Sequence, residues 1–468
     1  MRHRIRASTR TGRYSQSIFA AAAVLVISSS TPRAAVMDGA ALEWNQIALT
    51  ATVTAGQGPL PQSRSMTIVQ VSMHDAVNGI TGKHPTYLPT GPAPAGASPE
   101  AAAIAAAHRA LVTLFPLQSS GLDAARAASL AARGLTEADA GVGWGESAAA
   151  AILTARANDG AAQAQFPYIA PGGGIPGVWV AIGSTPALLA GWGNVAPWVL
   201  RSGSQFRPDD PPSVTSGRYA RDYREVQELG ALTSATRTAE QTGIARFWLA
   251  TPSAIWNHVA RQVIAARGLD LSDTTRALAL IYLAASDAGI ACWDAKYTYN
   301  FWRPMAAIRN GDLDGNDATV GDPAWQPLFP TPPHPEYISG HTTNSSAMAT
   351  MLGFLFGDDP GVPIVAISPT NPAFPRQWQS FGEGVDEVIN ARIYSGIHYR
   401  TSDEVGARVG RQVARGSSPT TRCGRSRGEH WCQAGRGQAP AVARRAAADA
   451  LFRIAGSGGD AAATWRRP

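Results

Sequence analysis

The sequence predicts an all-α protein with long loops, and three observations support that prediction. Several segments place apolar residues at the 3.6-residue spacing of a helix. Segments that alternate apolar and polar residues, as half-buried strands do, are scarce. The chain contains 47 Gly and 33 Pro among its 468 residues, and long stretches rich in both predict loops between helices. Because 45% of the residues are hydrophobic, the chain can bury a sizeable core.

The expected helices follow one another through the body of the chain. They cover residues 99–114, 137–155, 238–266 and 273–290. The first is rich in alanine, and Ser272 or Asp273 is a suitable N-cap for the last. Stretches rich in Pro and Gly separate the helices at residues 87–97, 167–197 and 207–216. A boundary near 205–235 would divide an N-terminal helical region, 37–230, from a C-terminal one, 231–414.

The N-terminal segment, residues 1–36, has the composition of an export signal. It holds six Arg and no acidic residue, and its apolar run of ten residues at 18–27 is too short to cross a bilayer. Cleavage between Ser28 and Ala35 would place the mature chain in the periplasm or outside the cell. A buried first helix or an uncleaved anchor is the alternative. No later segment is apolar over 18 residues, so we expect no stable membrane span in the mature chain.

The C-terminal tail, residues 415–468, differs from the body that precedes it. Its net charge is +7, and it shows no helical or strand period, which predicts disorder. A frameshifted end is the favoured explanation and a basic anchoring tail the other. Cys423 and Cys432 in this tail could pair with each other, whereas Cys292 in the body is expected to be a buried, small apolar residue.

The net charge of +6 does not indicate nucleic-acid binding, because the body carries the opposite sign. Residues 37–414 have a net charge of −7, so a nucleic-acid partner is disfavoured there. Only two of the 40 basic residues are Lys, at Lys83 and Lys296. Arg is the usual cation of this chain, so each Lys needs an explanation.

Three segments of the C-terminal region carry residue types that bind an oxyanion. They are KYTYNFWRP at 296–304, HPEYISGH at 334–341 and RIYSGIH at 392–398. Guanidinium forks suit the several oxygens of an oxyanion, and Lys adds a point charge. Ser339 and Gly340 precede a helical run, whose first backbone N–H groups favour an anion. Two His can divide their roles, one bonding to the central atom and one moving protons. The set suits tetrahedral phosphate or vanadate.

These motifs resemble those of the vanadium-dependent haloperoxidases, which share their site with type 2 phosphatidic acid phosphatases and bacterial class A acid phosphatases. The superfamily pattern is Lys-x6-Arg-Pro, then Pro-Ser-Gly-His, then Ser-Arg-x5-His. Two positions depart from it, since Ile338 and Ala391 replace the Pro and the Ser. The resemblance implies helical bundles of the haloperoxidase and acid phosphatase type, with vanadate as cofactor.

The resemblance also implies a role for each residue of the motifs. His398 would be the apical ligand of the vanadium, and His341 the acid–base group. The residues that would hold the vanadate oxygens are Lys296, Arg303, Arg392, Ser339 and the N–H of Gly340. Trp293 and His334 match positions near the halide site, and the His favours bromide or iodide over chloride. Asp403 is a candidate to orient His398, with a surface carboxylate as the equal alternative. The partners would be hydrogen peroxide and halide.

Other functions remain open on the residues alone. A phosphatase on the same scaffold would hydrolyse phosphomonoesters, with His398 as nucleophile and His341 as acid for the leaving group. A non-catalytic or misfolded product, or a protein that binds anionic surfaces through its basic tail, are the further possibilities. The run from Asp312 to Asp317 resembles a calcium loop, but Asp317 stands where Gly is required, which favours a polar turn.

Overall fold

The computed structural model describes residues 39–416, apart from 89–90 and 184. The predicted export signal and the basic tail with Cys423 and Cys432 lie outside the described residues. Within them the protein is helical, with a single pair of short strands. The all-α prediction is therefore confirmed.

The helices and strands follow in chain order. The helices are α2 (Gly39–Thr54), α3 (Pro59–Thr81), α4 (Pro99–Leu114), α5 (Ser119–Ala132), α6 (Ala140–Arg156), α7 (Gly217–Leu229), α8 (Ala239–Phe247), α9 (Pro252–Ala266), α10 (Leu271–Tyr299), α11 (Pro304–Arg309), α12 (Gly340–Phe356), α13 (Phe381–Tyr394) and α14 (Arg400–Ala414). Strands β1 (Ile364–Ala366) and β2 (Arg376–Trp378) pair antiparallel, with Val365 opposite Gln377.

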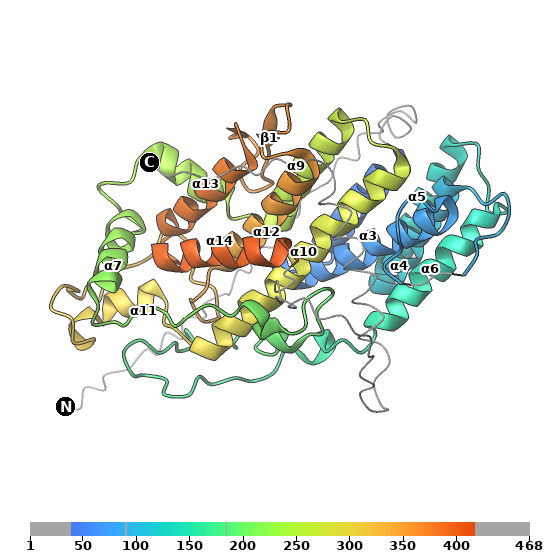
Figure 1. Ribbon diagram of the computed structural model, residues 1–468. Coiled ribbons are helices and arrows are strands. Elements are labelled where there is room, and N and C mark those ends of the chain that lie inside the picture. The colour runs from blue at the N-terminus through green and yellow to red at the C-terminus, as the bar shows by residue number, and fades with distance from the viewer. Residues whose placement is uncertain (1–38, 89–90, 184, 417–468) are drawn as a thin grey trace, which may run out of the picture.

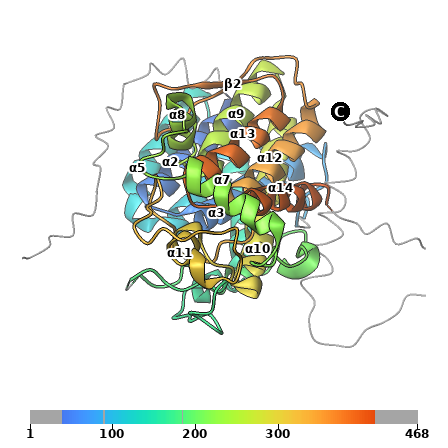
Figure 2. The same ribbon diagram turned by 90° about the vertical axis from the view of Figure 1, so that its left-hand side faces the viewer.

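Helix α10 runs through the middle of the molecule (Figure 1). Helices α4, α5 and α6 gather at one end, while α7, α13 and α14 lie toward the other (Figures 1 and 2). Helix α10 packs along α3 on one side and along α12 on the other, and α12 packs against α14. One hydrophobic core includes residues from Ala40 to Ala414, so both predicted regions contribute to it, and the boundary near 205–235 stays a prediction.

The predicted helix 238–266 is wrong in one respect, because the structure divides it into α8 and α9. Pro252 is the first residue of α9, a position where no helix hydrogen bond needs its N–H. In the middle of one continuous helix the missing N–H and the proline ring would break the helix. Thr251 caps α9 by accepting a hydrogen bond from the backbone N–H of Ala254, at 3.3 Å. The four residues between the helices form a turn that closes one side of the site described below.

Helix α10 is longer than the predicted 273–290. Its N-cap is Asp270, neither Ser272 nor Asp273, and the Asp270 carboxylate accepts the backbone N–H of Asp273 at 2.9 Å. It ends at Tyr299, and the left-handed conformation of the C-cap residue Asn300 (φ 49°) closes the last turn. By length and composition α10 could cross a membrane, but 94% of its most apolar window is buried inside the protein. Helix α4 taken with residues 116–132 passes the same test, with a bend of 118°.

Two glycines of α14 let it lie close against the first turns of α12. A Cβ on Gly406 would come within 2.9 Å of the Ser339 carbonyl oxygen, and one on Gly410 within 2.2 Å of the Thr343 carbonyl oxygen. Both distances are shorter than a Cβ atom tolerates, so the packing requires glycine, most strictly at position 410. This close approach brings the start of α14 to the start of α12, where the oxyanion motifs lie.

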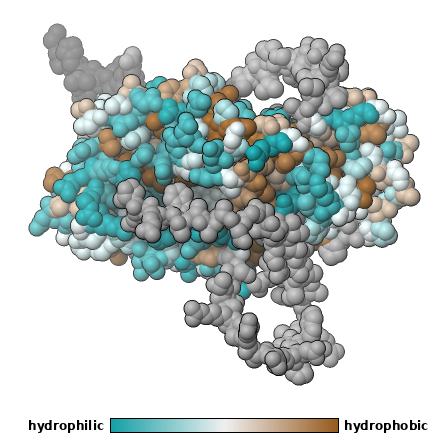
Figure 3. Space-filling view, turned by 45° about the horizontal axis from the view of Figure 1, so that its top comes forward, coloured by the Kyte–Doolittle hydropathy of each residue, from teal (hydrophilic) through white to brown (hydrophobic). Residues whose placement is uncertain are grey.

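The remaining sequence predictions concern loops and one thiol. Residues 310–319 form the expected polar turn, in which Asp314 accepts the Thr319 hydroxyl at 2.8 Å. Cys292 is free and fully buried, as predicted. The face shown in Figure 3 is mainly hydrophilic, with scattered apolar side chains.

Candidate active site

The three motif segments meet at the ends of five helices. Lys296 lies in the last turn of α10 and Arg392 in the last turn of α13, where the helix dipole favours a positive charge. Arg303 is the N-cap of α11, and Ser339 is the N-cap of α12. His398 precedes α14 by two residues. Helix ends thus supply the three cations of the candidate site.

All three cations are buried and bind backbone carbonyls. Lys296 is fully buried, and its Nζ donates to the carbonyl oxygens of Pro335 (3.0 Å) and Glu336 (2.8 Å). Arg303 donates from Nε to the carbonyl of His334 and from Nη1 to that of Ile397, both at 2.8 Å. Arg392 donates from Nη1 to the carbonyl of Trp248 at 2.9 Å, while its buried Nε has no partner among the described residues.

No ion pair neutralises these cations within the described part of the chain. Burial lowers the pKa of Lys296 to about 7 and the pKa values of Arg303 and Arg392 to about 10. Burial also raises the pKa of Glu336 to about 7 and that of Asp403 to about 8. A bound anion would stabilise the charged form of each cation. The site is therefore electrostatically suited to an anion.

His398 lies in the centre of this set. It is 2% exposed, its Nδ1 lies 2.7 Å from Oε1 of Glu336, and its Nε2 lies 3.3 Å from Nη1 of Arg303. Burial, followed by the charges of Arg303 and Lys296, lowers its pKa well below the usual value. His398 is thus neutral at neutral pH, and a neutral imidazole is the form that bonds through a nitrogen lone pair.

The turn between α8 and α9 closes another side of the site. Its Trp248 carbonyl accepts from Arg392, and its Ala250 carbonyl lies 3.2 Å from Nε2 of His341. An oxygen that can only accept requires hydrogen on Nε2, so Nδ1 of His341 carries the lone pair. Burial, followed by the charge of Arg392, lowers the pKa of His341 well below its usual value. Nδ1 of His341 is therefore available to accept a proton.

The start of α12 adds backbone donors. Ser339 does not cap α12 with its side chain; its Oγ lies 3.2 Å from Oγ1 of Thr342 instead. The first backbone N–H groups of α12 are thus left for another acceptor. A Cβ on Gly340 would come within 3.2 Å of the Trp293 ring, so glycine keeps this approach open.

Trp293 and His334, the predicted halide-site residues, lie against each other. Their ring centroids are 4.8 Å apart, and both side chains are nearly buried. Nδ1 of His334 lies 2.8 Å from Nη2 of Arg303, and the Trp293 indole donates to the carbonyl of Leu188 at 3.2 Å. The structure thus joins both residues to the cation cluster.

The predicted role of Asp403 requires correction. Its Oδ1 accepts the Thr342 hydroxyl at 2.7 Å, and the carboxylate at Nδ1 of His398 belongs to Glu336. Asp403 is fully buried, so it is no surface carboxylate either. Glu336 is absent from the predicted site residues, although it lies inside the second motif segment; its acidic side chain among apolar neighbours and prolines was the available signal.

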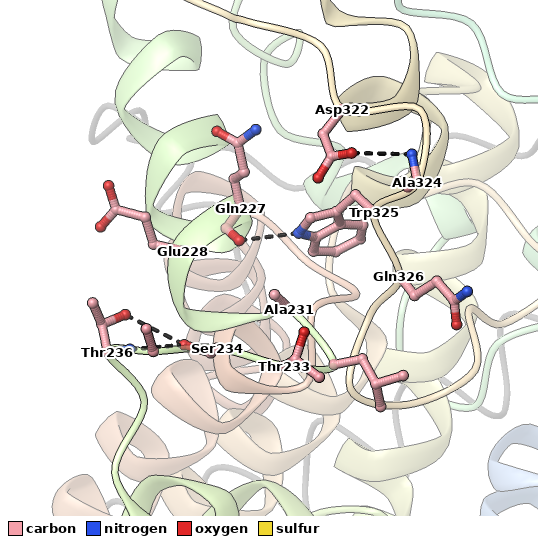
Figure 4. Close-up of a pocket in the computed structure, with 12 residues that line it drawn as sticks. Gln227, Glu228, Ala231, Thr233, Ser234, Thr236, Asp322, Ala324, Trp325 and Gln326 are labelled. Atoms are coloured by element: carbon pink, nitrogen blue, oxygen red, sulfur yellow. Dashed lines mark hydrogen bonds between the residues drawn. The ribbon is translucent and has the colours of Figure 1, made fainter.

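A polar hollow of about 550 Å³ lies elsewhere on the molecule (Figure 4). The end of α7, residues 231–236 and residues 322–326 line it, and the Trp325 indole there donates to the carbonyl of Gln227 at 3.0 Å. None of the oxyanion-site residues lines this hollow, so it is separate from the candidate active site.

Sequence comparison finds a similarity to one family over the part of the chain that carries the three motifs. Residues 276–423 match the model of the second helical-bundle domain of vanadium chloroperoxidase. The vanadium chloroperoxidase of Curvularia inaequalis is 29% identical over 177 residues, which is 31% of this chain and 28% of that protein. The match thus spans just over a quarter of the length of this relative.

Structural comparison extends the similarity over most of the chain. The structure of the first bacterial vanadium-dependent iodoperoxidase matches with 25% sequence identity and a TM-score of 0.69. This match covers 80% of this chain and 94% of the iodoperoxidase chain. The apo form of a bacterial vanadium-dependent chloroperoxidase, at 19% identity and a TM-score of 0.60, covers 77% and 93%. The fold is that of the vanadium haloperoxidases. Residues 276–423 are similar to the second helical-bundle domain of vanadium chloroperoxidase, and vanadate is the cofactor that this similarity implies.

The residues present fit vanadate. Among the described residues, Nε of Arg392 has no partner, the three buried cations have no ion pair, and no side chain caps the first N–H groups of α12. Together these features match a compact, multiply charged oxyanion. Lys296, Arg303, Arg392, Ser339 and Gly340 would hold its oxygens, and His398 would bond to the vanadium through Nε2.

Proposed function

We propose that this protein is a vanadate-dependent haloperoxidase that oxidises iodide or bromide with hydrogen peroxide. The arrangement of His398 supports the proposal most strongly, because a neutral imidazole presents Nε2 among three buried cations to which residues 39–416, as described, supply no ion-pair partner. Bound vanadate would supply the Lewis acidity that activates peroxide toward halide.

The residues of this chain would divide the remaining work. Lys296, Arg303 and Arg392 would neutralise the oxyanion and fix its orientation, as preorganised charges do in a site closed to water. His341, with its Nε2–H held by the Ala250 carbonyl, would take the proton from hydrogen peroxide at Nδ1 and return it later. Its lowered pKa keeps it in the basic form at neutral pH.

The preference for iodide or bromide is the finer part of the proposal. His334 places an imidazole against Trp293 and Arg303. This imidazole makes the proposed halide site more polar than the phenyl ring of a Phe at the same position would. The similar proteins include an iodoperoxidase as well as chloroperoxidases, so the choice of halide rests on His334. His334→Phe should therefore lower iodide and bromide oxidation relative to chloride oxidation, as steady-state rates with each halide would show.

The test uses the purified protein loaded with orthovanadate. With peroxide, it should oxidise iodide and brominate a dione reporter, and His398→Ala should abolish both. Absence of turnover with iodide and bromide, despite bound vanadate, would contradict the proposal. Release of phosphate from an aryl phosphate, lost in His398→Ala and inhibited by vanadate, would support a phosphatase instead.

A further inference from the structure

The carboxylate of Glu336 lies directly behind His398. Its Oε1 is 2.7 Å from Nδ1 of His398 and 3.1 Å from the backbone nitrogen of Tyr399, which donates to it. Glu336 is fully buried and His398 is 2% exposed. Two neighbouring groups of one loop thus converge on a single oxygen that comes from the segment before α12.

This geometry determines which nitrogen of His398 carries hydrogen. A carboxylate oxygen accepts, so Nδ1 must be the donor, and in a neutral imidazole Nε2 then holds the lone pair. Nη1 of Arg303, which can only donate, lies 3.3 Å from Nε2. Both contacts require the same tautomer. In the other tautomer, the Nε2–H of His398 would face an N–H of the Arg303 guanidinium. Its unprotonated Nδ1 would face the Glu336 oxygen, with no hydrogen bond between them.

We propose that Glu336 is the positioning residue that holds His398 in its Nδ1-protonated tautomer and so directs the Nε2 lone pair toward the central atom of the bound oxyanion. The inference rests on the proposed vanadate site, yet it concerns the bond from nitrogen to vanadium rather than halide oxidation. Carboxylates that hold ligating imidazoles in this way alter metal affinity about 10- to 100-fold when they are replaced.

The second buried carboxylate of the site provides the comparison. Asp403 is buried to the same extent as Glu336 but accepts from Thr342, and no hydrogen bond joins it to His398 among the described residues. Asp403→Asn is therefore a matched control, because it removes a buried carboxylate of the same site without touching the His398 contact.

Two substitutions separate the acceptor from the charge. Glu336→Gln keeps an oxygen that can accept from both donors, and the Tyr399 N–H favours that oxygen over the amide nitrogen at this position. Glu336→Leu has a similar size and no acceptor. We expect Glu336→Gln to retain the tautomer and Glu336→Leu to lose it.

The first measurement compares two anions by calorimetric titration of the vanadate-free protein. Orthovanadate would bond to Nε2, whereas inorganic phosphate would need only the cations and backbone donors. Glu336→Leu should weaken vanadate binding about 10- to 100-fold and leave phosphate binding unchanged or tighter. Glu336→Gln and Asp403→Asn should retain the ratio of the two affinities. Equal weakening of both anions in Glu336→Leu would overturn the inference.

The second measurement observes the tautomer directly by nitrogen-15 NMR of protein labelled at its nine His. The His398 signals are assigned as those lost in His398→Ala. Hydrogen on Nδ1 in the unsubstituted protein and in Glu336→Gln, but not in Glu336→Leu, is the expected result. Hydrogen on Nε2 in the unsubstituted protein would refute the role of Glu336 even if vanadate binds and halide is oxidised. A protein that binds no vanadate would refute the proposed function as well.

Discussion

Two buried clusters of cations in this molecule are neutralised in different ways. In the first, Asp159 accepts from Arg64 at 2.7 Å and lies 2.8 Å from Arg156, whose guanidinium also stacks 4.2 Å from the Trp198 ring. In the second, the described residues around Lys296, Arg303 and Arg392 offer backbone carbonyls and the rings of His334, His398 and Trp293, but no carboxylate in an ion pair. The first cluster contains its own carboxylate, although Nε of Arg156 has no partner there, whereas the second has no carboxylate paired with its cations among the described residues.

The difference distinguishes buried charges that stabilise the fold from buried charges that bind a ligand. A buried cation is costly unless it is paired, and of the two clusters the described part of the chain supplies a carboxylate partner to the first alone. Glu336 and Asp403 do not take that place in the second, because their carboxylates contact His398 and Thr342 and form no ion pair with the three cations among the described residues. Stability should depend on the first cluster and anion affinity on the second.

Asp159→Asn should produce the largest change in stability. The substitution leaves Arg64 and Arg156 without a carboxylate, and breaking a buried pair in this way costs about 3–5 kcal/mol of unfolding free energy. Urea unfolding measures this loss, with vanadate affinity in the folded variant as the control. A loss below about 1 kcal/mol, as exposed pairs give, would contradict the comparison.

Arg392→Met should affect binding rather than folding. Loss of a charged donor removes about 1.5–3 kcal/mol from anion binding, which is about a 10- to 100-fold weaker phosphate affinity. The unfolding free energy of the anion-free protein should stay the same or rise, because an unpaired buried cation is removed. Calorimetric titration and urea unfolding measure the two quantities. A marked destabilisation with unchanged phosphate affinity would show that Arg392 is structural.

Anion affinity should fall as the pH rises through 7. Without an anion the pKa of Lys296 is lowered to about 7 by burial, so Lys296 is charged below that pH and neutral above it. An anion binds the charged form, so sulfate affinity should fall about tenfold from pH 6 to pH 8, with uptake of a proton at pH 8. Sulfate does not itself titrate in this range. Lys296→Arg should reduce the dependence, and a sulfate affinity that is independent of pH would contradict it.

Lys83→Ala should have the smallest effect. Lys83 is the other lysine of the chain, and it forms exposed ion pairs with Asp270 and Asp273 at 2.6 and 2.8 Å. Such pairs contribute about 0–1 kcal/mol, so the melting temperature should change little and anion affinity not at all. Thermal melting and phosphate titration check this. A loss of phosphate affinity in Lys83→Ala would contradict the expectation that Lys296, and not Lys83, contributes to anion binding.

The local elements were the most accessible to sequence analysis. The predicted helix 99–114 matches α4 at both ends, because alanine content, helical spacing and the Ser98 cap act within a few residues. The predicted helix 238–266 is wrong because the apolar spacing continues across Pro252, while the missing N–H of this proline prevents one continuous helix.

The candidate site was accessible only in part. The motif spacings indicated Lys296, Arg303, Arg392 and His398, and the fold brings these four side chains together. The partner of His398 was predicted as Asp403, five residues away, but it is Glu336, 62 residues away. A distance along the chain does not predict a contact between two segments that only helix packing brings together.

The sequence by itself determined the helical class and the set of groups that can bind an oxyanion, because helical spacing, caps and side-chain chemistry are properties of short segments. The tertiary structure decided which of those groups are paired. Gly406 and Gly410 allow α14 to approach α12, and that approach sets Asp403 against Thr342 while the loop before α14 brings His398 to Glu336. The α8–α9 turn adds the carbonyls that orient Arg392 and His341. Contacts of this kind depend on the packing of distant helices, so no local pattern of residues specifies them.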